Sequence, residues 1–172
     1  YETIPNFHNT ESRLADFEQA VRRDVKNRAR TCQPEIQFVQ ARKKDCSVLM
    51  ELLREGRLPL RVTHNDTKLN NILFDAKTGK GLCIIDLDTI MPGLALSDYG
   101  DSIRFGASTG AEDEKDLNKV HFDMHLFELY TKGYLETAGP VLTDTEKEYL
   151  PWGARLLTLE CGIRFLTDYL RG

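Results

Sequence analysis

The sequence lacks the features that mark several large classes of protein. Its four cysteines form no CxxC pair, which argues against a zinc site or a disulfide framework and is typical of reduced thiols in a cytosolic protein. No apolar run approaches the length of a membrane span, and no signal peptide opens the chain. The net charge of -4 gives no electrostatic footprint for nucleic acid. We therefore expect a cytoplasmic protein with no nucleic-acid and no membrane partner.

The sequence also lacks the motifs that grip nucleotide phosphates. It contains no GxGxxG, no GxxxxGK[ST] and no strand resembling V-A-I-K. If a nucleotide is used, the groups that grip its phosphates are expected outside this chain.

Apolar spacing predicts a helix-dominated α+β fold. Positions repeating at three and four residues indicate one helix from Asn9 or Thr10 and a second from Pro34 to Gly56. Apolar runs indicate short strands, the last two joined by the glycine-containing turn "AKTGK". The expected strands span residues 58–64, 71–75 and 81–86, and the later helices span residues 98–105, 117–134 and 143–169.

Between two of the predicted strands lies a polar loop, "RVTHNDTKLNNILFD", that carries Asp66 and Asn71. Asp86 follows at the end of the next apolar run. These are the parts that phosphoryl transfer to a hydroxyl needs: one carboxylate accepts or orients the hydroxyl proton, while an amide oxygen and a second carboxylate hold Mg²⁺ against nucleotide phosphates. The alternative is ordinary turn chemistry, in which Asp and Asn are common.

The segments "HNDTKLNN" and "CIIDLD" resemble the catalytic loop and metal-binding segment of the aminoglycoside phosphotransferase and choline kinase group, which is related to protein kinases. Longer stretches, "RLPLRVTHNDTKLNNILFD", "IIDLDTIMPGLALSDYGDSIRF" and "ECGIRFLTDYL", resemble the N-acetylhexosamine 1-kinases of that group. These bacterial enzymes phosphorylate the anomeric hydroxyl of N-acetylglucosamine or N-acetylgalactosamine with ATP. The resemblance runs through essentially the whole chain and implies a protein-kinase-like fold.

The resemblance implies roles for individual residues. Asp66 matches the catalytic base and would also contact substrate, Asn71 a magnesium ligand, and Asp86 the metal-binding aspartate. His64 matches a loop histidine that supports the backbone. Lys68 stands where protein kinases have a lysine that contacts the transferred phosphate. The implied cofactor is Mg²⁺, with ATP as co-substrate.

Four further residues are candidates for the same site. Asp88 would point to the same side as Asp86 if the strand continues, so it either adds to the metal site or anchors the loop. In related phosphotransferases an aspartate near the "SDYGD" segment supports the catalytic loop, which implies that role for Asp98 or Asp101. Arg164 lies in a segment that resembles the part of the sugar kinases contributing a substrate-contacting arginine.

Taken together, these features predict that residues 1–172 are the C-terminal catalytic and substrate-binding lobe of a sugar kinase, with a small β-hairpin at the catalytic loop and the N-terminal nucleotide-gripping lobe absent. Such a fragment is expected to be inactive alone. Choline, an aminoglycoside or another small alcohol are alternative acceptors, and a non-catalytic binding lobe is the non-enzymatic alternative. Relatives have been labelled mucin desulfatases, but a sulfatase needs C/S-x-P-x-R, and "CQPEI" places Ile36 where the arginine must stand.

Overall fold

The computed structural model describes residues 2–111 and 114–172 and confirms a helix-dominated α+β fold. Four short strands are present in this part of the chain: β1 (Arg61–Thr63), β2 (Ile72–Phe74), β3 (Gly81–Ile84) and β4 (Met91–Gly93). The α-helices are α1 (Thr10–Arg23), α2 (Gln33–Ala41), α3 (Val48–Arg54), α4 (Ala95–Gly106), α5 (Met124–Ala138) and α6 (Asp144–Arg171). Short 3₁₀ helices are η1 (Ala29–Thr31), η2 (Lys43–Ser47), η3 (Leu69–Asn71), η4 (Leu87–Thr89) and η5 (Leu117–Lys119).

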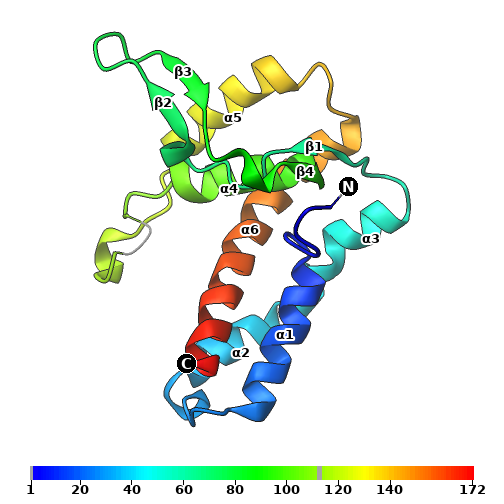
Figure 1. Ribbon diagram of the computed structural model, residues 1–172, viewed down its shortest axis with the longest axis vertical. Helices are drawn as coiled ribbons and strands as arrows, with labels where there is room; N and C mark the ends of the chain where they lie inside the picture. The colour runs from blue at the N-terminus through cyan, green and yellow to red at the C-terminus, as the bar shows by residue number, and fades with distance from the viewer. Residues whose placement is uncertain (1, 112–113) are drawn as a thin grey trace.

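The long helix α6 forms the spine of the molecule, with α1 beside it and the sheets near its N-terminal end (Figure 1). The helices α1, α2 and α3 share one apolar core with α6, which includes Phe17 of α1, Leu49 of α3 and Ile163 of α6. The helices α1 and α6 begin at the residues that the sequence predicts. Asn9 caps α1 by accepting a hydrogen bond from the Ser12 N–H at 3.0 Å, and Thr143 opens α6 in a capping box with Glu146.

A close crossing of α4 over α6 places the second half of the site. A Cβ atom added to Gly100 would collide with the carbonyl oxygen of Gly153, and one added to Gly153 would collide with the carbonyl oxygen of Leu96. Only glycine at both positions allows the two backbones to approach this closely. The crossing holds the residues of α4 around Asp98 and Asp101 against the middle of α6.

Two separate antiparallel pairs replace the single small sheet suggested by the sequence. The predicted hairpin is present as β2 and β3, with Ile72 opposite Ile84. By contrast, β1 pairs with β4, a strand the apolar pattern did not predict, with Thr63 opposite Met91. Pattern reasoning missed β4 because its sequence, "MPG", contains proline and glycine, which are rare inside strands but tolerated at edges.

Two predicted helices are interrupted. The helix expected from Pro34 to Gly56 divides into α2, η2 and α3, since the polar stretch "RKKD" between the first and last parts offers no apolar face to bury. The helix expected over residues 117–134 begins only at Met124. Asp123 caps it by accepting hydrogen bonds from the N–H groups of His125 at 2.8 Å and Leu126 at 3.0 Å.

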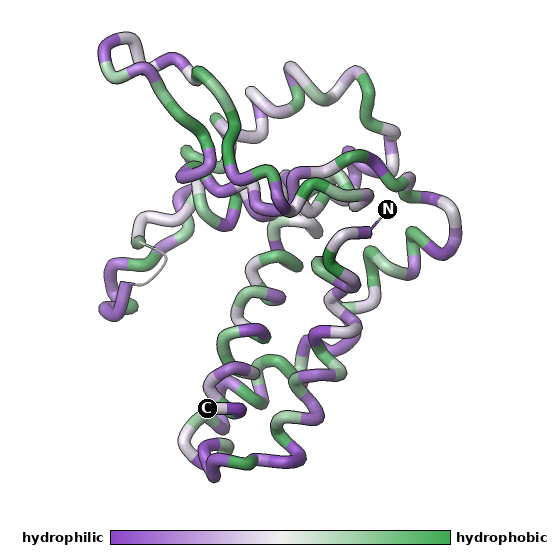
Figure 2. The backbone as a smooth tube through the Cα atoms, in the orientation of Figure 1, coloured by the Kyte–Doolittle hydropathy of each residue, from purple (hydrophilic) through white to green (hydrophobic). Residues whose placement is uncertain are grey.

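The β2–β3 hairpin projects from the body and is apolar along both strands (Figures 1 and 2). Leu82 is 65% exposed and Ile84 is 59% exposed, which is unusual for large aliphatic side chains in adjacent positions of one sheet. Among the described residues no helix combines the length and the apolar character that crossing a membrane requires.

Candidate active site

The loop between β1 and β2 brings Asp66, Lys68 and Asn71 together. The Asn71 side-chain amide donates to the Asp66 carboxylate at 2.9 Å and to the Asp66 carbonyl oxygen at 2.8 Å. Lys68 Nζ lies 2.9 Å from Asp66 Oδ2. The short helix η3 makes this arrangement possible, because it turns the chain back so that a residue five positions later reaches Asp66.

The following hairpin brings Asp86 to the same loop. The N–H of Ile85 donates to the carbonyl oxygen of Asn71 at 2.9 Å, so Asp86 is one residue beyond the position paired with Asn71. The His64 ring nitrogen Nε2 lies 3.0 Å from the carbonyl oxygen of Ile85, joining the start of the loop to the same point. Asp86 adopts a left-handed backbone with φ 64°. This conformation turns the chain sharply where the carboxylate is presented.

Asp86 and Asp88 do not lie together on one strand, which the sequence-based prediction assumed. That prediction needed the strand to continue so that alternate residues share one side. Instead β3 ends at Ile84, Asp86 turns the backbone, and Asp88 lies in η4. The geometric reason for placing Asp88 in the metal site is therefore lost, and its assignment stays an untested prediction.

Asp98 lies near the start of α4, and its side chain binds the backbone of the loop. Its two carboxylate oxygens accept hydrogen bonds from the N–H groups of His64 at 2.9 Å and Asn65 at 2.7 Å. Burial raises the pKa of Asp98 overall, although the two N–H donors act in the opposite direction. The carbonyl oxygen of Asp98 also accepts a hydrogen bond from the Thr67 hydroxyl at 2.5 Å.

Asp101, the other aspartate proposed for loop support, is engaged differently. Its Oδ1 accepts hydrogen bonds from Arg104 Nε at 3.0 Å and from a terminal nitrogen of Arg104 at 2.9 Å. Of these two aspartates, Asp98 hydrogen-bonds the loop backbone directly, whereas the described hydrogen bonds of Asp101 stay within α4.

Asn65, which sequence reasoning passed over, is the most heavily bonded residue of the loop. It is 4% exposed and has a positive φ of 66°. Its amide nitrogen donates to the carbonyl oxygen of Thr89 at 2.9 Å, while its amide oxygen accepts from the Thr63 hydroxyl at 2.9 Å. Asparagine tolerates this left-handed conformation better than most residues, which is the signal in the sequence that was available.

His8 connects the N-terminal segment to the loop and was also missed. Its Nδ1 lies 2.8 Å from Glu160 Oε1, and its Nε2 lies 2.8 Å from the carbonyl oxygen of Asn65. Burial alone would lower the pKa of His8, but the hydrogen bond and charge of Glu160 and the Asn65 carbonyl raise it overall. Because both partners are acceptors, the protonated ring, with two N–H donors, fits this position best.

A polar cavity of about 260 Å³ opens beside Asp66. It lies between the loop, the N-terminal segment, α4 and α6, and it contains both Lys68 and Arg164. Arg164 is exposed, with its guanidinium carbon 5.3 Å from the centroid of the Phe165 ring. Of the residues named from the sequence, Asp66, Lys68, Asp101 and Arg164 thus line one cavity, whereas Asp86 and Asp88 are exposed and do not line it.

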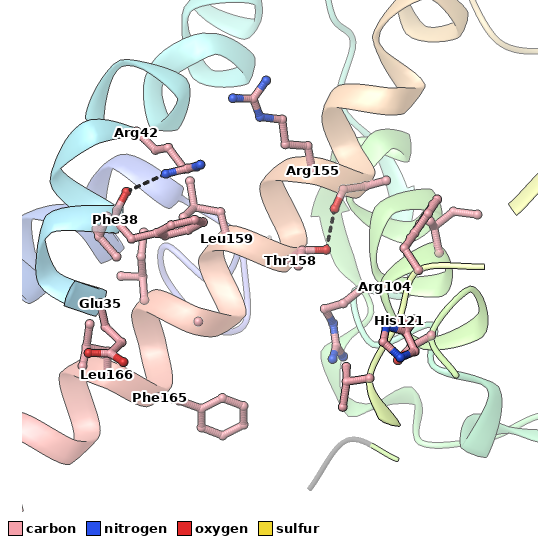
Figure 3. A pocket seen from close by; sticks show the side chains of 18 of the residues that line it. Glu35, Phe38, Arg42, Arg104, His121, Arg155, Thr158, Leu159, Phe165 and Leu166 are labelled. Carbon is pink, nitrogen blue, oxygen red and sulfur yellow. Dashed lines mark hydrogen bonds between the residues drawn. The ribbon is translucent and has the colours of Figure 1, made fainter. Parts of the chain in front are cut away.

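A larger hollow of about 1160 Å³ lies elsewhere, between α2, α6 and the segment before α5 (Figure 3). Its walls carry Phe38, Leu159 and Phe165, with arginines at the margin. None of the loop residues Asp66, Lys68 and Asn71 belongs to it. Size alone would point to this groove, but the candidate base Asp66 and its neighbour Lys68 line the smaller polar cavity.

The donor set suits a hard divalent cation. Asn71 commits its amide nitrogen to Asp66, which leaves its amide oxygen as the ligand atom, and Asp86 presents an exposed carboxylate nearby. No group of three or more His, Cys, Asp or Glu side chains able to hold a metal is found in residues 2–111 and 114–172. Magnesium at phosphate sites does not require such a cluster, because it uses one or two carboxylates together with substrate phosphates and water. The residues present therefore fit magnesium.

Comparison with known families agrees with this geometry. A model of the phosphotransferase enzyme family matches residues 1–139, which is most of the chain and includes the whole catalytic loop and Asp86. The chain therefore belongs to the phosphotransferase enzyme family. Membership implies a kinase-type enzyme that uses ATP and a small-molecule substrate. Arg164 lies outside the matched residues, so its role depends on the cavity and on the resemblance described above.

Proposed function

We propose that the protein transfers the terminal phosphoryl group of ATP to the anomeric hydroxyl of N-acetylglucosamine or N-acetylgalactosamine. The observation that carries the proposal is the position of Asp66. Its carboxylate lies between Lys68 and Asn71 and lines a polar cavity of about 260 Å³. This volume is below the range of about 300–1,000 Å³ that is usual for drug-sized ligands, which favours a small polar acceptor.

In this proposal Asp66 orients the acceptor hydroxyl and takes its proton as the oxygen attacks phosphorus. The Lys68 ammonium, 2.9 Å from Asp66, keeps positive charge at the position where charge develops on the transferred group. His64 and Asp98 support the loop backbone, and Arg164 contacts the sugar from α6. Much of the rate is expected to come from positioning, because phosphoryl transfer requires little covalent chemistry from the protein.

Asn71 and Asp86 are the residues proposed to hold Mg²⁺, with Asp88 as a further candidate. When bound, the ion neutralises charge on the nucleotide phosphates. Asn71 has a second task that depends on this chain alone. Its two hydrogen bonds to Asp66 join the proposed base to a proposed metal ligand, so a shift of either residue displaces the other.

The nucleotide-gripping groups are proposed to lie outside this chain, which would then be the C-terminal catalytic and substrate-binding lobe and inactive alone. The exposed apolar side chains of the β2–β3 hairpin support this, since Leu82 and Ile84 lie on one face of β3, where a second lobe and the adenine ring would cover them. The proposed location is the cytoplasm, because ATP is the proposed co-substrate.

Sulfatase chemistry has no support. Cys32, the residue that would need to become its nucleophile, is buried in the core formed by α1, α2, α3 and α6, and it does not line the polar cavity.

The proposal is tested by phosphorus NMR of the full-length protein with Mg-ATP and N-acetylglucosamine, with choline and an aminoglycoside in parallel samples. We expect a new anomeric sugar-phosphate signal. Phosphocholine or a phosphorylated antibiotic would retain the mechanism but overturn the substrate. Unchanged ATP in all three samples would count against phosphoryl transfer to these acceptors and would favour a binding-only lobe.

A further inference from the structure

Two buried polar atoms near the catalytic loop have no hydrogen-bond partner among the described residues. They are Asp101 Oδ2 and Arg13 Nε. Both residues line the polar cavity that contains Asp66. Buried polar atoms are paired in the great majority of cases, so an acceptor and a donor left unpaired at one cavity require an explanation.

The carboxylate of Asp101 is held rigidly with one oxygen unused. Asp101 is 5% exposed, and Oδ1 accepts both hydrogen bonds from Arg104. Arg104 thus compensates the charge and sets the orientation of the group, while the buried Oδ2 has no partner among the described residues. Water access is low at this depth, so the energetic advantage of pairing Oδ2 with a ligand donor is larger than at the surface.

The guanidinium of Arg13, a residue of α1, also lines the cavity. One of its terminal nitrogens donates to the carbonyl oxygen of Phe7 at 3.0 Å, which ties Arg13 to the N-terminal segment. This leaves the buried Nε–H as a donor without a described acceptor. Asp101 of α4 and Arg13 of α1 thus each bring to the cavity lining a buried polar atom with no described partner.

We propose that Asp101 and Arg13 form a two-point recognition site for the acceptor molecule. Asp101 Oδ2 accepts a hydrogen bond from a hydroxyl that is not phosphorylated, and Arg13 Nε donates to an oxygen of the same molecule. This inference rests on the proposed function, because it assumes that the cavity beside Asp66 receives the acceptor. It also gives Asp101 a task beyond the loop support suggested by the resemblance.

The pairing selects for a neutral polyol such as a monosaccharide. A molecule of this class has spare hydroxyl groups after one is presented to Asp66, and each hydroxyl both donates and accepts. Choline has a single hydroxyl and no N–H, so its binding would leave Asp101 Oδ2 and Arg13 Nε unpaired. A site built around buried polar groups rejects ligands that leave them unpaired.

The test is the steady-state kinetics of the full-length protein with N-acetylglucosamine and its 3-deoxy, 4-deoxy and 6-deoxy analogues, combined with Asp101→Asn. The amide keeps one oxygen for Arg104 but replaces the free acceptor with a donor. We expect one analogue to lose about 10- to 100-fold in kcat/KM with the wild type, the scale of a hydrogen bond to a charged group. In Asp101→Asn, the parent sugar should lose a similar factor and that analogue should lose no more.

Calorimetric binding of the sugars provides a readout that does not require turnover, and thermal denaturation reports whether each variant folds. Arg13→Lys, which retains charge but removes Nε–H, is a second variant if Asp101→Asn does not fold. The matched control is Asp45→Asn, another aspartate paired with an arginine, Arg155, outside this cavity. The control should leave the whole analogue series unchanged.

Failure of the recognition site and failure of the proposed function give different results. If N-acetylglucosamine is phosphorylated but all deoxy analogues match it, or if the same analogue loses the same factor in Asp101→Asn, the recognition site is wrong and the proposed function stands. If no sugar binds and none is phosphorylated, the proposed function is wrong and the recognition site falls with it.

Discussion

The catalytic loop and the hairpin that follows it are neighbours in the chain but are held in opposite ways. The loop is bound to the rest of the molecule on three sides, by Asp98 of α4, by Thr89 before β4 and by His8 of the N-terminal segment. The β2–β3 hairpin projects from the body with large aliphatic side chains exposed on both strands. The candidate base, Asp66, belongs to the loop, and the candidate metal ligand Asp86 is exposed and follows the end of β3 by two residues.

This difference separates two kinds of mutational effect. Changes to the groups that hold the loop should reduce both stability and activity, because the same hydrogen bonds support the fold and position Asp66. Changes to Asp86 or to the exposed hairpin should leave the stability of this chain nearly unaltered. Activity and stability measured together can therefore support or contradict the comparison.

The largest effect apart from Asp66 is expected at Asp86. Asp86→Asn should reduce kcat about 100- to 1,000-fold, the scale of removing one electrostatic stabiliser from an active site, and should raise the magnesium concentration needed for half-maximal activity. Because Asp86 is exposed, the free energy of unfolding should change by no more than about 0.5 kcal/mol. A magnesium titration of the full-length variant measures the first effect. Wild-type magnesium dependence would remove Asp86 from the metal site.

A smaller loss of activity, accompanied by a loss of stability, is expected for Asp98→Asn. The amide keeps only one acceptor oxygen for the two N–H groups of His64 and Asn65, so one of these donors loses its partner. We expect kcat/KM to fall about 10- to 100-fold and the free energy of unfolding to fall by about 1–3 kcal/mol. Chemical denaturation and kinetics on the same samples, with Asp45→Asn as control, check both. Lost activity at unchanged stability would break the proposed coupling.

His8, which contacts the catalytic loop, should make the stability of the protein depend on pH. Its pKa is raised above 6.5 in the folded protein, so its stabilising contribution is fully present below that value and is lost as the pH rises through the folded pKa. His8→Gln removes the charge and should lower stability by about 1–2 kcal/mol at acidic to neutral pH, with little effect at alkaline pH. Denaturation of both proteins across this range tests the prediction. Parallel curves at all pH values would show that the charge of His8 contributes nothing.

The smallest effect is expected on the hairpin surface. Leu82→Ser replaces a side chain that is 65% exposed, so the unfolding free energy of this chain should change by less than about 0.5 kcal/mol. The matched core variant is Leu58→Ser, at a leucine that is 2% exposed, which should cost several times more. Comparable losses from the two variants would mean that the hairpin is packed rather than exposed in solution.

Much of the fold followed from local patterns. Apolar spacing and capping residues predicted the starts of α1 and α6, and glycine in the turn predicted the β2–β3 hairpin. The failures have physical causes. The strand β4 is short and contains Pro92, and its pairing with β1 spans about 30 residues, which no local pattern reveals. The second predicted helix is interrupted because only some of its side chains can pack into the core. Helix α6, far along the chain, forms part of that core.

The candidate site was predictable only in part. The spacing of Asp66, Asn71 and Asp86 identified the loop, since that chemistry is encoded within about 20 residues. The cavity was not predictable, because it is formed by Arg13, Asp101 and Glu160 from three helices separated by most of the chain. Asp101 was noticed but given another role, because nothing in the sequence indicates that one of its oxygens is left unpaired.

The central claim is that the carboxylate of Asp66 takes part in phosphoryl transfer, and it is tested most directly by kcat for Asp66→Asn in the full-length protein, with nucleotide affinity measured on the same sample. We predict a fall in kcat of about 100- to 10,000-fold, the range for loss of a general base, with nucleotide affinity nearly unchanged. A variant that retains the wild-type kcat would contradict the account.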